Sequence, residues 1–398
     1  MTSNHFTKGK NMFLVVSFLF WFPHFIYVPV LSPYLAFLGG EYTFIGIVLG
    51  SYGLMQLIFR LPTGIFSDLV KVRKPFIIAG MLISSLSCLI FSMTESLGWI
   101  LLARVLAGIA AATWVTFTVL YSTYFSNKEV HRAMGSISFI VVLGQFMGMS
   151  ISGYVVNELG WRAPFWIGAV ISVIGAIIAF FVFEPKEKIA KEPMKVRELV
   201  AVMREPSLLI ISLLSILAHS IIFTTIFGFI PTYALHIGLR TNDISFIVLA
   251  FMIPHAIATL FIGKYVVPFL GEWKSLQIAF LLAAMGTIVT PLVEMKWLFL
   301  VVQGVNGFAL GLIFPLLLGM SIESIAQEKR ATAMGAYQAL YAIGIFAGPF
   351  VAGIFNAKFG IDAGFYFAGS LGVVAVGVTI IQRRKGTHEM ITNVNKSM

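Results

Sequence analysis

The segment GQFMGMSISG (residues 144–153) returns 200 residues later as GIFAGPFVAG (residues 344–353). The two copies share glycine at their first, fifth and tenth positions and phenylalanine at their third. Glycines spaced in this way form the packing surface between membrane helices, because they allow two backbones to approach closely. The two segments therefore predict membrane helices that occupy equivalent places in a duplicated structure.

The repeat extends beyond these segments at the same offset. Ten identities at one ungapped offset are hard to attribute to shared apolar composition. Both copies enter the membrane from the same side, so the repeat is parallel, an architecture typical of transporters. The further identities pair AMG (133–135), Gly160, Ala163 and Phe165 with AMG (333–335), Gly360, Ala363 and Phe365.

The composition of the 398-residue chain indicates that lipid is its main solvent, since 59% of the residues are hydrophobic and only 11% are charged. Soluble domains carry roughly a quarter of charged residues. The apolar stretches are continuous, which predicts helices and excludes an alternating β-barrel. The single cysteine, Cys88, excludes an intrachain disulfide, and the first apolar stretch is too long for a cleaved signal peptide.

Twelve apolar stretches are long enough to cross a bilayer as helices, which requires about twenty residues each. The sequence therefore predicts an all-α polytopic membrane protein. The predicted spans are 12–38, 43–67, 75–94, 97–124, 133–156, 162–183, 207–237, 243–266, 275–293, 297–322, 332–356 and 362–382.

The basic residues gather on one side of this topology. The N-terminal tail, the even-numbered loops and the C-terminal tail hold 21 of the 27 lysines and arginines, and the odd-numbered loops hold four. Loops rich in lysine and arginine face the cytoplasm. Both termini are thus predicted to be cytoplasmic, in a multi-pass protein of the cell (plasma) membrane. The net charge of +10 is then a topology signal and does not indicate nucleic-acid binding.

The longest polar stretch lies between the sixth and seventh spans and divides the chain into two halves. We expect six-helix bundles at residues 1–184 and 207–398, joined by a cytoplasmic linker at 185–206. Within the linker, VRELVAVM (196–203) has apolar residues at the spacing of an amphipathic helix on the membrane surface. A solvated linker explains the same stretch equally well.

The loop after the second span carries the motif GIFSD (64–68), followed by Arg73 and Lys74. Gly64 can let helices approach closely, and Asp68 at a helix end can pair with a cation or cap a facing helix. The motif resembles the loop signature of the major facilitator superfamily, Gly-x-Leu-Ala-Asp followed by Gly-Arg-Lys, with the basic pair one residue late and its preceding glycine absent. The resemblance implies a gating role for Gly64, Asp68, Arg73 and Lys74. For the basic pair, an ordinary charged loop is the alternative.

The fourth span contains Arg104 and, four residues later, Gly108. A charge inside a span costs at least a few kcal/mol unless it faces a cavity, water or a partner. The pair is similar to the Arg-x-x-x-Gly element of the same superfamily's fourth helix, which implies a functional charge. Because Trp99 at the predicted outer edge is only five residues away, snorkelling to the surface is the alternative.

The repeated glycine segments look like the superfamily's antiporter motif, Gly-x-x-x-Gly-Pro-x-x-Gly-Gly, with methionine at the proline position of the first copy. The resemblance covers almost the whole chain. It implies two parallel-repeat six-helix bundles around one cavity, lined by spans 1, 2, 4, 5, 7, 8, 10 and 11, with spans 3, 6, 9 and 12 facing lipid. The motif residues are Gly144, Gly148, Gly153, Gly344, Gly348, Pro349 and Gly353.

Ionisable residues in the middle of the predicted spans are candidates for function. No aspartate or glutamate falls there, whereas His24, His219 and His255 do. Histidine titrates near neutral pH and can carry a coupling proton, although a hydrogen-bonded packing histidine is the alternative for each. The other candidates for a cavity are Tyr27, Gln56, Arg60, Trp114, Gln145, Tyr233, Gln303, Asn306, Gln338 and Tyr341.

The lack of carboxylates at mid-membrane predicts a neutral or anionic substrate, because a cationic drug is held best by a buried carboxylate. Two alternatives stay open. Aromatic faces such as Tyr27, Trp114 and Tyr341 could bind a cation, or Asp68 and Glu323 could be reached through water.

We expect a secondary transporter coupled to protons, acting as a monomer, that exports a small organic molecule. An importer of a neutral or anionic organic solute and, less favoured, a lipid flippase are the alternatives. The sequence has no Gly-x-Ser-x-Gly, His-Glu-x-x-His or Walker motif. We therefore expect neither an enzyme nor an ATP motor, and no cofactor or metal.

Overall fold

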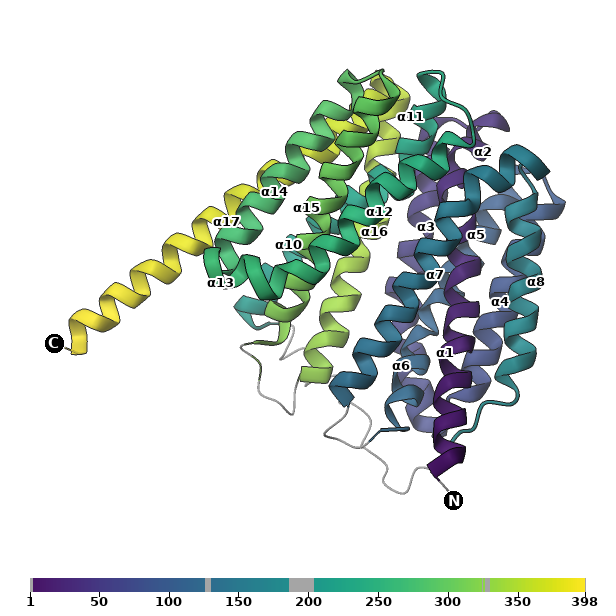
Figure 1. Ribbon diagram of the computed structural model, residues 1–398, viewed down its shortest axis with the longest axis horizontal. Coiled ribbons are helices and arrows are strands. Elements are labelled where there is room, and N and C mark those ends of the chain that lie inside the picture. The colour runs from purple at the N-terminus through teal and green to yellow at the C-terminus, as the bar shows by residue number, and fades with distance from the viewer. Residues whose placement is uncertain (1–2, 126–129, 186–203, 324, 326–329, 398) are drawn as a thin grey trace. The chain divides into compact units, whose positions relative to one another are not determined.

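The computed structural model describes residues 3–125, 130–185, 204–323, 325 and 330–397, and within these residues it contains helices and no strand (Figure 1). The contacts group the chain into two compact units. Unit 1 comprises Met1–Leu199 and Pro231–Phe246, and unit 2 comprises Val200–Ile230 and Ile247–Met398. The segment 231–246, which covers the end of the seventh span and the start of the eighth, thus packs with the first six spans.

Within the described residues, the first six spans fold into eight helices, because two of the spans are broken in the middle. These helices are α1 (Ser3–Ile26), α2 (Val28–Phe37), α3 (Tyr42–Val70), α4 (Lys74–Met93), α5 (Leu97–Ala112), α6 (Trp114–Ser122), α7 (Val130–Leu159) and α8 (Ala163–Ala179).

The last six spans contain α-helices interrupted by short π-helical and 3-10 turns. They are α10 (Pro206–Thr224), η2 (Thr225–Phe229), α11 (Ile230–His236), α12 (Asp243–Phe261), η3 (Ile262–Val266), α13 (Val267–Leu270), α14 (Glu272–Val289), η4 (Thr290–Leu292), α15 (Lys296–Glu323), α16 (Arg330–Phe359) and α17 (Asp362–Ser397). Figure 1 shows that α17 continues as a helix well past the end of α14, against which it packs.

The predicted spans agree with these helices. Among the described residues, eleven helices have the length and hydropathy of a membrane span. The twelfth is the shorter apolar helix Ala163–Ala179, with 17 residues, at the lower limit for crossing a bilayer. The all-α polytopic fold with twelve apolar helices is thereby confirmed. The possible surface helix at 196–203 lies outside the described residues.

Several spans are interrupted at positions that the hydropathy does not mark. The first span breaks at Tyr27, two residues before Pro29, which has no N–H to donate and lies in the first turn of α2. The fourth breaks at Thr113, between α5 and α6. The seventh and eighth each contain a π-helical turn, η2 and η3, an irregularity that is frequent at functional sites.

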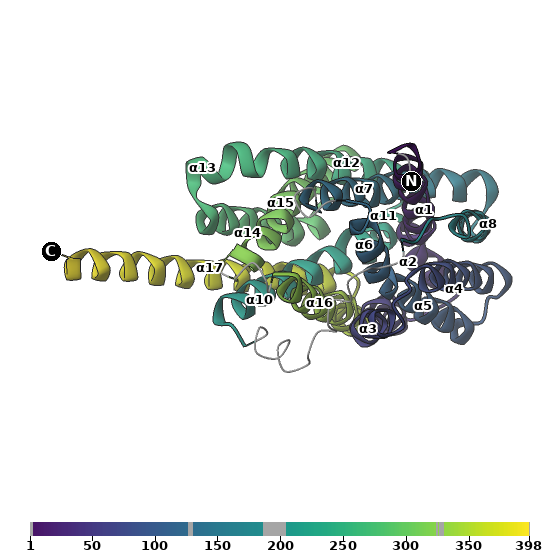
Figure 2. The same ribbon diagram turned by 90° about the horizontal axis from the view of Figure 1, so that it is seen from below.

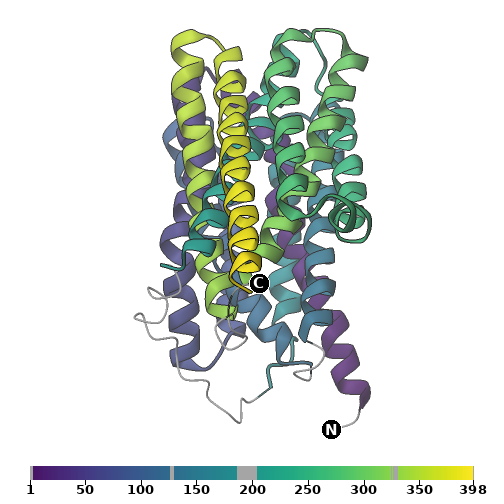
Figure 3. The ribbon, with the colours of Figure 1, turned by 90° about the vertical axis from the view of Figure 1, so that its left-hand side faces the viewer.

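Helix pairing repeats between the halves, as the duplicated sequence predicts. In the first half α1 packs on α7 and α4 packs on α8, and in the second half α10 packs on α16 and α14 packs on α17. Span 1 thus packs on span 5 as span 7 packs on span 11, and span 3 packs on span 6 as span 9 packs on span 12. Figure 2 shows α4 next to α5, and Figure 3 shows α16 beside α17.

The glycine segments form the contact surfaces of these repeated pairs. A Cβ atom at Gly148 of α7 would lie 2.9 Å from the carbonyl oxygen of Phe22 on α1, and one at Gly348 of α16 would lie 2.6 Å from the Cα atom of Ser220 on α10. Distances below 3 Å leave no room for a side chain. Glycine at these positions therefore sets how closely spans 5 and 11 approach spans 1 and 7.

Candidate functional site

The loop between α3 and α4 is held by an ion pair. Arg73 Nη2 lies 2.9 Å from Asp68 Oδ1, and the Arg73 side chain is 7% exposed whereas that of Asp68 is 40% exposed. Between them Lys71 takes the left-handed conformation, with φ of 58°, and ends α3. The structure thus brings together Asp68 and Arg73, two of the residues assigned to the gate by resemblance.

A residue that the sequence analysis missed completes this loop. The carboxylate of Glu184, just beyond α8, accepts hydrogen bonds from the backbone N–H groups of Arg73 (2.5 Å) and Lys74 (3.1 Å). It therefore caps α4 at the positive end of the helix dipole. Lys74 Nζ donates to the carbonyl oxygen of Phe180. The available signal was an acidic residue ending the sixth span, on the same predicted side as the loop.

The space around Gly64 would accommodate a side chain, in contrast to Gly148 and Gly348. A Cβ atom there would meet Val115 at 3.6 Å, an ordinary van der Waals distance. Its carbonyl oxygen accepts a hydrogen bond of 2.8 Å from Ser67 Oγ. Close helix approach, the reason suggested by the sequence, is therefore not what requires glycine at this position.

Arg104 lies in the interior of unit 1. Its side chain is 1% exposed, Nη1 donates a hydrogen bond of 3.3 Å to the hydroxyl of Tyr27, and the guanidinium lies 4.2 Å from the ring centre of Tyr52. The side chain does not reach the surface, so the structure does not support the snorkelling alternative.

Gly108 explains how Arg104 meets Tyr52. A Cβ atom at Gly108 would lie 2.7 Å from both Met55 Cβ and the carbonyl oxygen of Tyr52. Glycine therefore lets α5 approach α3, and Arg104, one turn earlier on α5, reaches the Tyr52 ring. The spacing of the arginine and the glycine thus has a direct structural purpose.

His24 belongs to the same interior cluster. Its Nδ1 donates a hydrogen bond of 2.7 Å to the Phe20 carbonyl oxygen, and its ring centre is 6.5 Å from that of Tyr52. Trp114, half-buried at the start of α6, packs edge-on against Trp21 at 5.1 Å. The first, second and fourth spans thus contribute side chains to one aromatic and cationic cluster.

Two other polar candidates of unit 1 pair with each other. Arg60 Nη2 donates a hydrogen bond of 2.6 Å to Gln56 Oε1, one turn away on α3, and both side chains are buried. Gln145 is half-buried on α7, next to Gly144.

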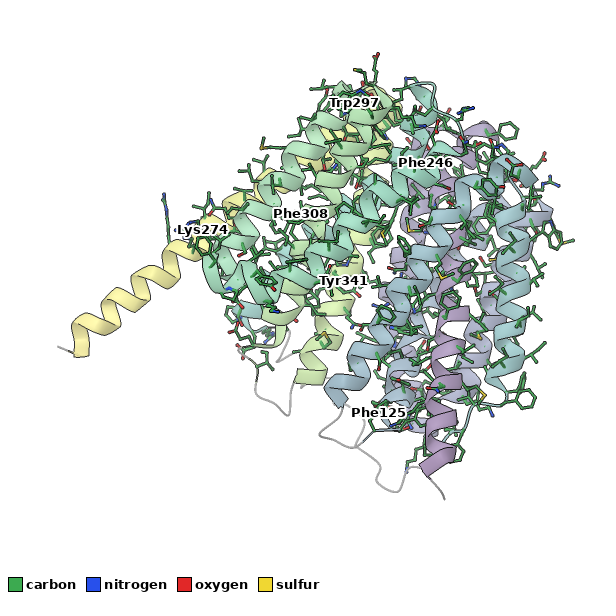
Figure 4. All side chains as sticks on the ribbon, viewed as in Figure 1. Phe125, Phe246, Lys274, Trp297, Phe308 and Tyr341 are labelled. Atoms are coloured by element: carbon green, nitrogen blue, oxygen red, sulfur yellow. The ribbon has the colours of Figure 1, made fainter. Side chains whose placement is uncertain are left out.

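The second-half candidates gather around Phe314 in unit 2. The His219 ring stacks on Tyr341 with centres 4.1 Å apart and planes at 3°, and it lies 4.8 Å from the Phe314 ring. His255 lies 6.1 Å from Phe314. His219, His255, Phe314 and Tyr341 are all only partly buried. Figure 4 places Tyr341 midway along the helices of its unit.

The remaining candidates lie elsewhere. Gln303 Nε2 donates a hydrogen bond of 3.4 Å to Thr290 Oγ1, and Asn306 packs against Gly286 of α14, so both residues face the ninth span. Tyr233 is buried in unit 1, and Gln338 is half-buried on α16. Among the described residues, no group of three His, Cys, Asp or Glu side chains is arranged to hold a metal ion.

The profile of the Major Facilitator Superfamily matches residues 13–295 and 213–396, which together span nearly the whole chain. The chain belongs to the major facilitator superfamily. The two overlapping matches agree with the repeat of 200 residues. The fold expected from the loop and glycine motifs is therefore the fold of its family, and the chain is a membrane transporter of this type.

Other members of the superfamily align along most of the chain. The inner membrane transport protein YajR of Escherichia coli is 27% identical over 91% of this chain and 80% of its own length. Multidrug resistance protein 2 of Bacillus subtilis is 24% identical over 90% of this chain and 91% of its own length. The quinolone resistance protein NorA of Staphylococcus aureus is 24% identical over 89% of this chain and 90% of its own length.

Solved structures of the superfamily share the fold. A point mutant of the nucleoside transporter NupG superposes with a TM-score of 0.79 at 15% identity, covering 94% of this chain and 99% of that chain. A bacterial homologue of the human lysosomal transporter Spinster gives 0.77 at 14% identity, covering 96% and 98%. At these identities the likeness concerns the fold alone.

Proposed function

We propose that this member of the major facilitator superfamily is a proton-coupled exporter of a small neutral or anionic organic molecule, working by alternating access. The observation that carries the direction is the full-length similarity to Multidrug resistance protein 2 and NorA, both named for drug resistance. An importer is the second candidate, since the NupG structure shows that the same fold serves a nucleoside transporter.

The histidines are the proposed carriers of the coupling proton. No aspartate or glutamate lies at mid-span in the sequence, and His219 is partly exposed beside Tyr341 and Phe314 in unit 2. Histidine changes charge within the physiological pH range. Its place among aromatic rings would put the proton next to the apolar part of a bound organic molecule.

Transport in reconstituted vesicles of defined pH gradient tests the proposal. We expect nalidixic acid, a quinolone with one carboxyl group, to move against its gradient when protons flow the opposite way, and an uncoupler to abolish this movement. Movement of the probe with the proton flow would instead identify an importer. Failure to move nalidixic acid, nucleosides or any other organic probe would refute the transport function as proposed.

The triple variant His24→Gln, His219→Gln, His255→Gln tests the proton carriers. We expect it to lose proton-driven accumulation, by about tenfold or more, while downhill exchange of the probe persists, because glutamine can hydrogen-bond but cannot take up a proton. His236→Gln, at the end of α11, is the control and should keep the wild-type rate. Full proton-driven transport by the triple variant would move the coupling role to Asp68 or Glu323.

A further inference from the structure

Arg104 and Tyr27 place two unused hydrogen-bond donors inside unit 1. Arg104 Nη1 donates to the oxygen of Tyr27, so the phenolic hydrogen of Tyr27 is left to donate elsewhere. Among the described residues no acceptor takes that hydrogen, and Arg104 Nε is buried without a partner. Both side chains are 1% exposed.

The positive charge at this place has no negative partner in the described part of the chain. Arg73 and Arg162, by contrast, each pair with a carboxylate, that of Asp68 and that of Glu95. What faces Arg104 are ring faces: Tyr52 at 4.2 Å and Tyr27 at 5.7 Å. Ring faces offset only part of the cost of dehydrating a cation. An anion would supply the missing charge and accept from both donors.

The second half of the chain has no counterpart of this cation. A Cβ atom at Gly307 of α15 would meet the Phe251 carbonyl oxygen, as one at Gly108 would meet the Tyr52 carbonyl oxygen, so Gln303, four residues before Gly307, stands where Arg104 stands in the first half. An aromatic ring is kept at the equivalent position, as Phe251, although the guanidinium is absent. Close packing of these two helices therefore does not by itself require the cation.

We propose that Arg104, the hydroxyl of Tyr27 and the ring of Tyr52 form a binding site for a small monovalent anion. The inference rests on the proposed function, since the carboxylate of a transported organic acid would be its ligand, with the apolar body against the rings of Phe91 and Phe165, which lie 5.2 and 5.4 Å from the Tyr27 ring. Chloride would satisfy the same donors. The ligand chemistry is therefore a monovalent anion from either source.

Calorimetric titration of the purified full-length protein tests the site. The probes are sodium benzoate, sodium chloride and neutral benzamide, at an ionic strength fixed with sodium sulfate. We expect benzoate to bind and benzamide not to bind, with competition by chloride if both anions use the site. Arg104→Gln should weaken anion binding by about tenfold or more, and Tyr27→Phe by about threefold, because each removes a donor.

Arg162→Gln is the matched control, because it removes the same charge from an exposed pair with Glu95; it should leave benzoate affinity unchanged. If Arg104→Gln yields no folded protein, Arg104→Lys and Tyr27→Phe decide, since lysine keeps the charge but loses the planar fork. Unchanged benzoate affinity in these two variants, or equal affinity for benzamide, would overturn the site.

The outcome is separable from that of the proposed function. Binding is measured without a membrane or a gradient, so anion binding in a protein that moves no organic molecule would leave the site standing and refute the exporter. Proton-driven export of a neutral probe by a protein that binds neither benzoate nor chloride would refute the anion site and leave the exporter standing.

Discussion

Asp68 pairs with Arg73, a nearly buried arginine. The charge of Asp68 can be removed without losing the backbone contacts that hold the loop. Asp68→Asn removes the counter-charge of Arg73, whereas Glu184 still holds the backbone N–H groups of Arg73 and Lys74. We expect transport to fall about fivefold or more while the amount of folded protein, measured by size-exclusion chromatography, stays at the wild-type level.

Glu95→Gln is the matched control for this substitution. It removes a carboxylate from the exposed pair with Arg162, and exposed pairs contribute little. Transport by Asp68→Asn at the wild-type rate in proteoliposomes would remove Asp68 from the mechanism.

At the scale of single residues, what the sequence predicts depends on how far apart the partners lie. Asp68 and Arg73 are five residues apart, and their association follows from the motif. Glu184 is 111 residues from Arg73, and the Arg104 contact with Tyr27 crosses 77 residues. Pairs of this kind depend on which helices pack together, which hydropathy does not specify. Gln303 and Asn306 illustrate the same limit, since a polar residue in a span can face a neighbouring helix instead of a cavity.

At the scale of helices, the glycine segments make a prediction about packing. Gly148→Ala would bring a methyl group to 2.9 Å from the Phe22 carbonyl oxygen and 3.0 Å from the Ile26 backbone nitrogen. Rigid backbone atoms cannot yield, so α7 must move away from α1. We expect the free energy of unfolding to fall by about 1–3 kcal/mol, measured as a lower midpoint in thermal unfolding.

Gly135→Ala is the control on the same helix. It lies on α7, is exposed, and its added methyl group would have no atom within 4 Å. We expect it to be neutral or slightly stabilising, because alanine favours helix more than glycine does. Equal midpoints for the two variants would contradict the role assigned to Gly148.

A second prediction for the helices concerns the ends of spans 1 and 7 within unit 1 that are predicted to face outward. Ser32 Oγ and Thr232 Oγ1 lie 2.5 Å apart, both buried, on α2 and α11. The two residues are separated by 200 positions, the offset of the repeat. Alternating access requires the helix ends that close one side of the cavity to separate, and this contact joins the ends of spans 1 and 7.

Paired cysteines test this contact, because the chain has a single native cysteine to remove. In a Cys88→Ala background, Ser32→Cys with Thr232→Cys should form a disulfide on oxidation, since the side chains are within bonding range. We expect transport to fall about tenfold and to return with a reductant, whereas Ser32→Cys alone should not respond to oxidant. Full transport by the cross-linked protein would show that these ends need not separate.

The sequence predicts the limits of the membrane spans but not the interruptions within them. The apolar part of each span begins and ends within a few residues of the prediction, because hydropathy directly measures what lipid requires. The helices themselves extend further at the two ends of the chain, where α1 begins at Ser3 and α17 ends at Ser397. The breaks at Tyr27 and Thr113 and the π turns η2 and η3 leave the hydropathy unchanged. They depend on how a helix fits its neighbours, as at Pro29, where the missing N–H permits a break without requiring one.

At the scale of the whole molecule, the charge distribution makes a prediction about orientation. Lys274 stands in an even-numbered loop and Glu294 in an odd-numbered one, and both side chains are exposed. Figure 4 shows Lys274 and Trp297, three residues after Glu294, near opposite ends of the helices of unit 2. Because the even-numbered loops and the tails hold 21 of the 27 basic residues, Lys274 and both termini should be cytoplasmic.

Single cysteines in the Cys88→Ala background decide the orientation. In intact cells, a membrane-impermeant maleimide should label Glu294→Cys and should not label Lys274→Cys, whereas after permeabilisation it should label both. Exposure of both side chains removes burial within the protein as a cause of failed labelling, so a difference reports the membrane alone. The reverse pattern would place both termini outside. The loop of Asp68 and Arg73 would then face the outside, so its assignment to the cytoplasmic gate would fail. The proton gradient proposed to drive export would also act across the protein in the opposite direction.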